Sequence, residues 1–231
     1  MGRSVAGSED IDGDSVPDIL AGAPNFSGGA GFVSGKAYAF SGATGAEIFS
    51  IQGEAPEDSL GLPVSDVPDL DGDAVPDMLV AARFHDGPGG ADAGRVYALS
   101  GATGAVLYTL DGASPGAEFG RALSGAGDVD GDGLGDFVVG EVGRATVFSG
   151  ATGAPIFART GGPSFGFSAA HAGDVNGDAV PDFIVGEPDE GIARVYSGVG
   201  GAFLEDLFFL DRAGSGGAFG FSVAGAGDVN G

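Results

Sequence analysis

The sequence predicts an all-β protein, a β-propeller built of four-stranded antiparallel blades, with about four blades and one further strand present. Short runs of Val, Ile, Leu and Phe are bounded by turn residues, as strands separated by tight turns are. A nine-residue acidic segment recurs after 59, 59, 46 and 54 residues, a spacing that fits four short strands with their turns. No apolar period of 3.6 residues persists for a dozen residues, so helices are not expected.

Each repeat begins with two predicted strands that the acidic segment joins. The first strand follows a Gly, which is preceded by Phe in the last three copies, by Leu60 in the second and by Met1 in the first. After the acidic segment comes a short apolar run, such as 19–21 or 78–80, which we expect to be the second strand. The acidic segments are therefore predicted to be loops between first and second strands.

The third and fourth predicted strands are joined by a Ser-Gly turn. Third strands such as 36–40 and 95–99 lead into Ser-Gly-Ala-Thr-Gly-Ala in three copies, where we expect the paired glycines to supply positive φ angles. A fourth apolar run follows each turn. Such small sheets bury both faces only by packing on their neighbours, which predicts radial blades. The predicted blades are 1–59, 60–118, 119–164 and 165–218, and 219–231 is the first strand and the start of the loop of a fifth.

Composition and charge exclude several classes of protein. Nine Lys and Arg against 33 Asp and Glu give a net charge of −24, which repels phosphate backbones, so no nucleic-acid partner is expected. The apolar runs are too short for a membrane helix, so no membrane span is expected in this chain. Cys is absent, which removes disulfides, thiolate metal sites and cysteine nucleophiles. Gly and Pro are abundant, but 43% hydrophobic residues and the regular repeat predict a packed core.

The acidic loops are predicted metal sites. Oxygen-bearing side chains occupy positions 1, 3, 5 and 9 of each loop, and Gly occupies position 4. At about 5 Å and an effective dielectric constant of about 20, each pair of like charges costs on the order of 3 kcal/mol, and a divalent cation reverses that sign. Ca²⁺ accepts several hard oxygen ligands in flexible geometry, whereas Mg²⁺ needs a tighter octahedron and transition metals favour nitrogen or sulfur. About four Ca²⁺ sites are therefore expected.

Each predicted site uses the same five positions. By analogy with the helical calcium loop, position 7 offers its backbone carbonyl and position 9 the closing carboxylate. The predicted ligands are Asp10, Asp12, Asp14, Val16 and Asp18; Asp69, Asp71, Asp73, Val75 and Asp77; Asp128, Asp130, Asp132, Leu134 and Asp136; and Asp174, Asn176, Asp178, Val180 and Asp182.

Three other interpretations of the acidic loops are weaker. An EF-hand has Gly at position 6, Glu at position 12 and flanking helices, whereas these loops close at position 9 between two strands. Asp, Asn and Gly also populate ordinary turns, but four copies with one unvaried spacing argue against turns alone. An aspartate nucleophile of the phosphatase type is disfavoured as well, because an enzyme does not need four nucleophiles.

Few side chains are candidates for catalysis, so no enzyme, no catalytic residue and no organic cofactor are predicted. We expect His85 and His171 to be surface or packed residues rather than general bases, and no Ser lies in a nucleophile elbow. The arginines that open the third strands, Arg95, Arg144 and Arg194, suggest either an anion-binding ring or pairing with nearby acids. Pairing is the more common role.

These motifs resemble the FG-GAP repeats of integrin α-subunit propellers and their bacterial relatives. Phe-Gly occurs at 119–120, 165–166 and 219–220, and Gly-Ala-Pro follows the second strand at 22–24. In the other repeats, the Gly-Ala-Pro element is replaced by Ala-Ala-Arg at 81–83, Gly-Glu-Val at 140–142 and Gly-Glu-Pro at 186–188. The resemblance covers essentially the whole chain. It implies a propeller, commonly of seven blades, with Ca²⁺ bound between the first and second strands of a blade and partners on the opposite face.

The function implied is that of an extracellular or cell-surface adhesion module that binds an unidentified protein or carbohydrate, with Ca²⁺ in a structural role. Two alternatives are the non-catalytic propeller portion of a secreted enzyme and a quinoprotein-like propeller, which residues 96–104 resemble although Trp is absent. Seven blades of about 55 residues need roughly 385 residues. We therefore expect a fragment of a longer protein, with the other blades and any signal peptide outside this chain.

Overall fold

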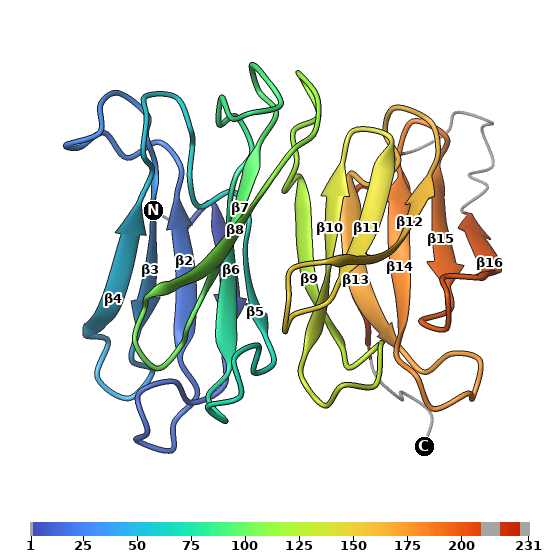
Figure 1. Ribbon diagram of the computed structural model, residues 1–231, viewed down its shortest axis with the longest axis horizontal. Helices are drawn as coiled ribbons and strands as arrows, with labels where there is room; N and C mark the ends of the chain where they lie inside the picture. The colour runs from blue at the N-terminus through green and yellow to red at the C-terminus, as the bar shows by residue number, and fades with distance from the viewer. Residues whose placement is uncertain (1, 209–217, 227–231) are drawn as a thin grey trace. The chain divides into compact units, whose positions relative to one another are not determined.

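The computed structural model of the chain describes residues 2–208 and 218–226. It contains four sheets of four strands, and every strand pair is antiparallel (Figure 1). In each sheet the strands lie in chain order, and no helix occurs in the described ranges. The prediction of an all-β fold made of four-stranded antiparallel meanders is confirmed.

The strand bounds show one pattern four times. The first sheet contains β1 (Ser4–Gly7), β2 (Ile19–Ala23), β3 (Lys36–Phe40) and β4 (Glu47–Gln52); the second contains β5 (Val64–Val67), β6 (Asp77–Ala82), β7 (Arg95–Leu99) and β8 (Val106–Asp111). The third contains β9 (Ala122–Gly127), β10 (Asp136–Glu141), β11 (Arg144–Phe148) and β12 (Pro155–Thr160); the fourth contains β13 (Ser168–Gly173), β14 (Asp182–Glu187), β15 (Ile192–Tyr196) and β16 (Phe203–Phe208).

Beyond the fourth sheet, residues 218–226 form no strand. The sequence predicts a first strand here, but no second strand of a fifth sheet lies among the described residues to pair with it. The start of the fifth acidic loop at Asp228 lies outside the described residues.

The sheets group into two compact units. Unit 1, Met1–Arg121, holds the first two sheets, and unit 2, Ala122–Gly231, holds the last two. In unit 1 the core combines Leu20, Ala37 and Ala39 with Val80 and Leu99, all fully buried. Small alanines on β3 leave room for the large side chains of the second sheet. Each fully buried Leu or Val stabilises the fold by about 1.5–3 kcal/mol.

The core of unit 2 is more aromatic. The rings of Phe183 and Tyr196 stack with centroids 5.4 Å apart, and Phe165 meets Tyr196 edge-on at 6.2 Å. Val138 and Val185 complete this cluster, and both are fully buried. Offset and edge-to-face pairs of this kind add about 0.5–1.5 kcal/mol beyond the area that they bury.

The Phe-Gly and Gly-Ala-Pro elements are glycine-rich because backbones touch there. A Cβ on Gly22 of β2 would lie 1.8 Å from the carbonyl oxygen of Gly61, and Gly61 itself has a φ of +96°. In unit 2, a Cβ on Gly140 would lie 2.2 Å from the carbonyl oxygen of Gly166. The second strand of one sheet therefore rests directly on the chain that opens the next sheet.

The apolar residue before that glycine is buried in three of the repeats. Leu60 and Phe165 are fully buried and Phe119 is 5% exposed, as expected of core positions. Phe219 differs, since 36% of it is exposed. It precedes the segment that forms no strand, so no complete sheet covers it among the described residues.

The Ser-Gly turns differ from the prediction in one respect. In the three Ser-Gly-Ala-Thr-Gly-Ala turns only the second glycine has a positive φ, for example +70° at Gly45 and +69° at Gly104. The first glycine is required by contact: a Cβ on Gly42 would lie 1.9 Å from the carbonyl oxygen of Pro17 in the acidic loop. This close approach joins the turn to the loop beneath it.

Candidate metal centres

Each acidic loop folds back on itself through two residues with positive φ. Position 4 has a φ of +82° at Gly13 and +84° at Gly72, which only glycine adopts freely. Position 6 is also left-handed, with φ of +69° at Ser15 and +66° at Ala74. The sequence predicts the first bend in every loop but marks the second only in the third loop, where position 6 is Gly133, because Ser and Ala seldom adopt this conformation.

The carboxylate at position 1 organises the loop around itself. Asp10 Oδ1 accepts the N–H of Gly13 at 2.7 Å and of Asp14 at 3.1 Å, and its Oδ2 accepts the N–H of Ser15 at 2.7 Å. These bonds, chiefly that of Ser15, hold the pKa of Asp10 below its usual value. The same three contacts recur at Asp69, Asp128 and Asp174.

The carboxylate at position 9 lies at the floor of the loop. Asp18 is 1% exposed, and its two oxygens accept the N–H of Ile11 at 2.8 Å and of Gly42 at 3.0 Å. Equivalent pairs of bonds hold Asp77, Asp136 and Asp182. Burial raises the pKa of Asp77 to about 6 and also raises that of Asp136.

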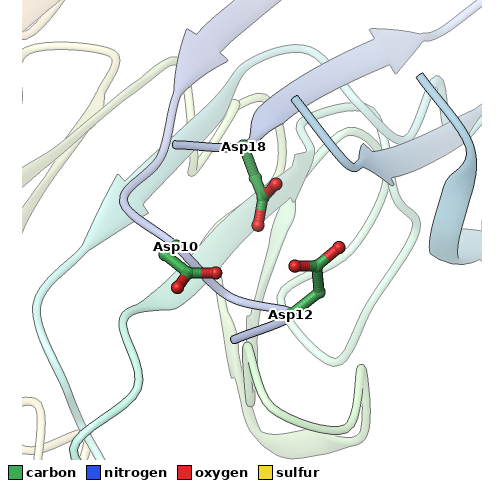
Figure 2. A group of neighbouring side chains, drawn as sticks. All are labelled: Asp10, Asp12 and Asp18. Carbon is green, nitrogen blue, oxygen red and sulfur yellow. The ribbon is translucent and has the colours of Figure 1, made fainter. Parts of the chain in front are cut away.

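In three loops, these two carboxylates converge with a third from position 3. Figure 2 shows Asp10, Asp12 and Asp18 turning their oxygens toward one another. Each offers one oxygen, and the three oxygens lie within 4.8 Å of one another. The other two groups are Asp69, Asp71 and Asp77, and Asp128, Asp130 and Asp136.

Position 5 is not part of these groups of three. The carboxylate of Asp14 instead accepts the N–H of Val16 at 2.9 Å, and that of Asp73 accepts the N–H of Val75 at 2.8 Å. The same bond joins Asp132 to Leu134 and Asp178 to Val180. The ligand roles expected of positions 5 and 7 remain predictions.

The fourth loop differs because its position 3 is Asn176. The Nδ2 of Asn176 donates to Asp178 Oδ2 at 2.9 Å and to Ser197 Oγ at 3.1 Å. The Val180 N–H lowers the pKa of Asp178 most, and the bonds that Asp178 accepts from Asn176 and from Ser197 Oγ lower it further. An amide donor thus offsets part of the negative charge, so the fourth loop has the least need of a cation.

The donor set fits calcium in the first three loops. Three hard carboxylate oxygens gather at one point in each loop, and each of the three carboxylates accepts at least one backbone N–H. Nitrogen and sulfur ligands, which transition metals favour, have no counterpart in these groups. Several carboxylates in flexible geometry are the ligand set that Ca²⁺ takes.

The residues missing from the predicted site are the first glycines of the Ser-Gly turns. Gly42, Gly101, Gly150 and Gly198 each donate their N–H to the position 9 carboxylate of their own repeat. Each glycine lies 24 residues after the carboxylate in the first two repeats but 14 and 16 residues after it in the last two, so spacing is only a partial signal. The link itself depends on how three strands pair, which spacing alone does not reveal.

The other candidate residues lie away from the loops. His85 is buried and its Nδ1 lies 3.0 Å from Asp58 Oδ1, while His171 is exposed on β13. Arg95 pairs with Asp111 at 2.7 Å and with Glu54 at 3.0 Å. Arg194 pairs with Glu187 and Asp206. These two arginines neutralise nearby acids, as the more common role predicts.

The chain is a repeat protein in which each repeat is a four-stranded sheet with an acidic loop between its first and second strands. Sequence comparison shows which known proteins share this pattern. Residues 1–35 match the family model of the FG-GAP repeat. Integrin alpha-PS2 of Drosophila melanogaster is 35% identical over 141 residues, which is 57% of this chain and 10% of that protein. Human integrin alpha-11 and integrin alpha-7 are each 30% identical, over 61% and 60% of this chain and 12% of each relative.

The family-model match and the integrin relatives confirm the predicted resemblance to FG-GAP repeats and integrin α sequences. The chain spans about a tenth of the length of the integrins that it matches. The matched relatives therefore share a segment with this chain, not their whole architecture.

Solved structures show the same fold. Rhamnogalacturonan lyase YesW matches 89% of this chain and 39% of its own with a TM-score of 0.55 and 18% identity. Saccharomyces cerevisiae Sqt1 matches 88% and 48% with a TM-score of 0.59 and 13% identity. At such identities the likeness concerns fold alone, and with the FG-GAP match it confirms the propeller-like class. No helix of the described residues is long and apolar enough to cross a membrane.

Proposed function

We propose that the acidic loops bind Ca²⁺ and that the chain belongs to an extracellular or cell-surface protein, in which it serves as an adhesion or ligand-binding module. The observation that carries the metal proposal is the convergence of three carboxylates in each of three loops. The ligands proposed are positions 1, 3, 5 and 9 with the backbone carbonyl of position 7, in four loops. The ion would have a structural role.

The chain's own residues prepare these sites. Backbone N–H groups fix the carboxylates at positions 1 and 9, so little order is lost when a cation arrives. Asp12 is exposed and completes the group from the solvent side. When bound, Ca²⁺ supplies the positive charge that relieves repulsion among the carboxylates.

The energetic effect of calcium favours an extracellular setting. For a site with a Kd of about 10⁻⁴ M, external Ca²⁺ of roughly 2 mM stabilises the fold by about 1.8 kcal/mol, whereas submicromolar Ca²⁺ contributes almost nothing. The integrin relatives support the same setting. They also support a binding role over catalysis, with a protein or carbohydrate as the partner.

The metal proposal is tested by removing the exposed carboxylate at position 3 from three loops. The triple variant D12N/D71N/D130N should lose most of the difference in melting temperature between Ca²⁺ and chelator. The matched control E57Q/E190Q/E205Q removes three exposed acids outside the loops and should keep that difference. Equal calcium responses in the two variants would contradict the proposal.

The binding role needs its own test. The immobilised chain is expected to retain at least one member of a panel of purified extracellular-matrix proteins and polysaccharides in Ca²⁺, and to release it in chelator. If circular dichroism shows that the sheets are still folded in chelator and the ligand is still retained, ligand binding does not require Ca²⁺. Retention of no panel member by folded, calcium-loaded chain would count against an adhesion role.

A further inference from the structure

Three arginines gather at the end of unit 1 that lies opposite its acidic loops. Arg3 precedes β1, whose other end leads into the first acidic loop, and Arg83 follows β6, which begins at the second acidic loop. Arg121 follows Gly120, and a Cβ on Gly120 would lie 2.7 Å from the Cβ of Ala81 near the end of β6. The direction of the strands therefore separates these arginines, which we call the arginine cluster, from the carboxylates.

Backbone contacts bring the elements of the cluster together. Leu62, just before β5, forms a bridge with Ala82, the residue before Arg83. One residue beyond Arg3, the Oγ of Ser4 accepts the N–H of Val64 at 3.1 Å. The starts of β1 and β5 and the end of β6 thus meet at one place.

Arg83 has an unmet requirement in this cluster. Its Nε is buried and has no hydrogen-bond partner, and its guanidinium lies 4.5 Å from the centroid of the Phe84 ring. By contrast, Arg95 and Arg194 each pair with two carboxylates. A buried donor without an acceptor costs about 1–3 kcal/mol, more when it is charged, so an acceptor at this point is favoured.

The charges around Arg83 also favour an anion. Burial lowers the pKa of Arg83, and the positive charges of Arg121 and Arg3 lower it further, whereas Glu118 raises it. Two further positive charges therefore lie close enough to act on Arg83, in a chain whose net charge is −24. An anion bound among them offsets their mutual repulsion.

We propose that Arg3, Arg83 and Arg121 bind an oxyanion, a carboxylate or sulfate group, presented by an acidic ligand. The planar fork of a guanidinium matches both groups and binds them through two parallel hydrogen bonds. The strong negative charge of the rest of the chain repels anions from the other surfaces. Anions are therefore expected to bind at the arginine cluster rather than elsewhere on the chain. This proposal rests on the proposed ligand-binding role of the chain and adds the chemical class of the ligand. It does not depend on the binding of Ca²⁺ by the acidic loops.

The test follows the Nε–H resonance of Arg83 in the ¹⁵N-labelled chain, recorded with and without Ca²⁺. Sodium sulfate and sodium acetate are titrated in separate arms, with ionic strength held constant by sodium chloride. A saturable shift of the Arg83 resonance is expected in at least one arm, and the stronger arm identifies the preferred group. The Arg159 resonance serves as the control, because its Nε already donates to the Gly201 carbonyl oxygen. Small, linear and equal shifts of both resonances would overturn the proposal.

One variant at the exposed edge of the cluster and one control outside it keep the test independent of folding. R3Q changes an exposed residue and should weaken the apparent affinity about tenfold, whereas the charge-matched control R144Q should leave it unchanged. An affinity that R3Q and R144Q change equally would show a general charge effect and overturn the site. A calcium titration that fails would leave this result unaffected, so the two proposals fail separately.

Discussion

The carboxylate of Asp18 accepts the N–H of Gly42, 24 residues further along the chain, at 3.0 Å. Its other oxygen accepts the N–H of Ile11 at 2.8 Å, so one buried side chain joins the acidic loop to the turn between β3 and β4. The same link occurs in all four repeats. The candidate metal site is thus part of the sheet rather than a free surface loop.

The first prediction separates the roles of two carboxylates in one loop. D18N should lower the free energy of unfolding by about 1–3 kcal/mol both with and without Ca²⁺, because the amide NH₂ faces a backbone N–H and leaves it unsatisfied. D12N changes an exposed carboxylate and should lower stability only in Ca²⁺. Urea unfolding in Ca²⁺ and in chelator measures both effects. A D18N variant as stable as the unaltered chain in chelator would show that the floor of the loop is dispensable.

The second prediction concerns the glycine that contacts the loop. G42A should destabilise unit 1 by about 2 kcal/mol or more, because the added Cβ would lie 1.9 Å from the Pro17 carbonyl oxygen. G7A is the matched control in the same sheet, since a Cβ there would meet nothing within 4 Å. Thermal melts compare the two variants. Equal melting temperatures would mean that the turn does not rest on the loop.

The third prediction uses the exception among the loops. N176D replaces the amide that donates to Asp178 and Ser197, so stability in chelator should fall by about 0.5–1.5 kcal/mol. The new carboxylate should also widen the gap in melting temperature between Ca²⁺ and chelator. N25D adds the same charge at an exposed position outside the loops and should leave that gap unchanged. A gap that narrows in N176D would contradict the proposed ligand role of position 3.

The fourth prediction is a pH dependence in unit 2. Burial raises the pKa of Glu141, although Arg144 opposes the shift. A carboxyl with a raised pKa stabilises the fold while it is protonated, and that stability is lost as the pH rises through its folded-state pKa. E141Q stays neutral, so it should be more stable than the unaltered chain at pH 7.5 and equal to it below about pH 4. Exposed Glu190 provides the control E190Q. If E141Q is less stable than the unaltered chain at pH 7.5, the ionised Glu141 carboxylate stabilises the fold, which contradicts the prediction.

Much of the fold follows from the repeat in the sequence. The apolar third strand predicted at 36–40 is β3, and the one predicted at 95–99 is β7, because period and turn residues both mark these boundaries. The Phe-Gly positions predict a buried side chain followed by a left-handed glycine, which Phe119 and Gly120 show. The local sequence pattern therefore predicts strand boundaries and buried positions, because both depend on residues within the same strand or turn.

The sequence pattern does not predict contacts between residues that are far apart in the chain. Carboxylate spacing predicts that Asp10, Asp12 and Asp18 converge, but not that Asp14 turns to the Val16 N–H instead. The Asp18 link to Gly42 depends on how β2, β3 and β4 pair. The arginine cluster was missed for the same reason. Arg3 and Arg121 share a repeat position after a glycine, but the sequence does not show that either lies near Arg83.

The most direct measurement is a calorimetric titration of Ca²⁺ into metal-stripped chain, with circular dichroism recorded on the same sample. Binding of about four ions per chain, with the fourth loop the weakest because Asn176 replaces a carboxylate, is the predicted result. No heat of binding from a chain that circular dichroism shows to be folded would contradict the account. The acidic loops would then be turns held by their own hydrogen bonds.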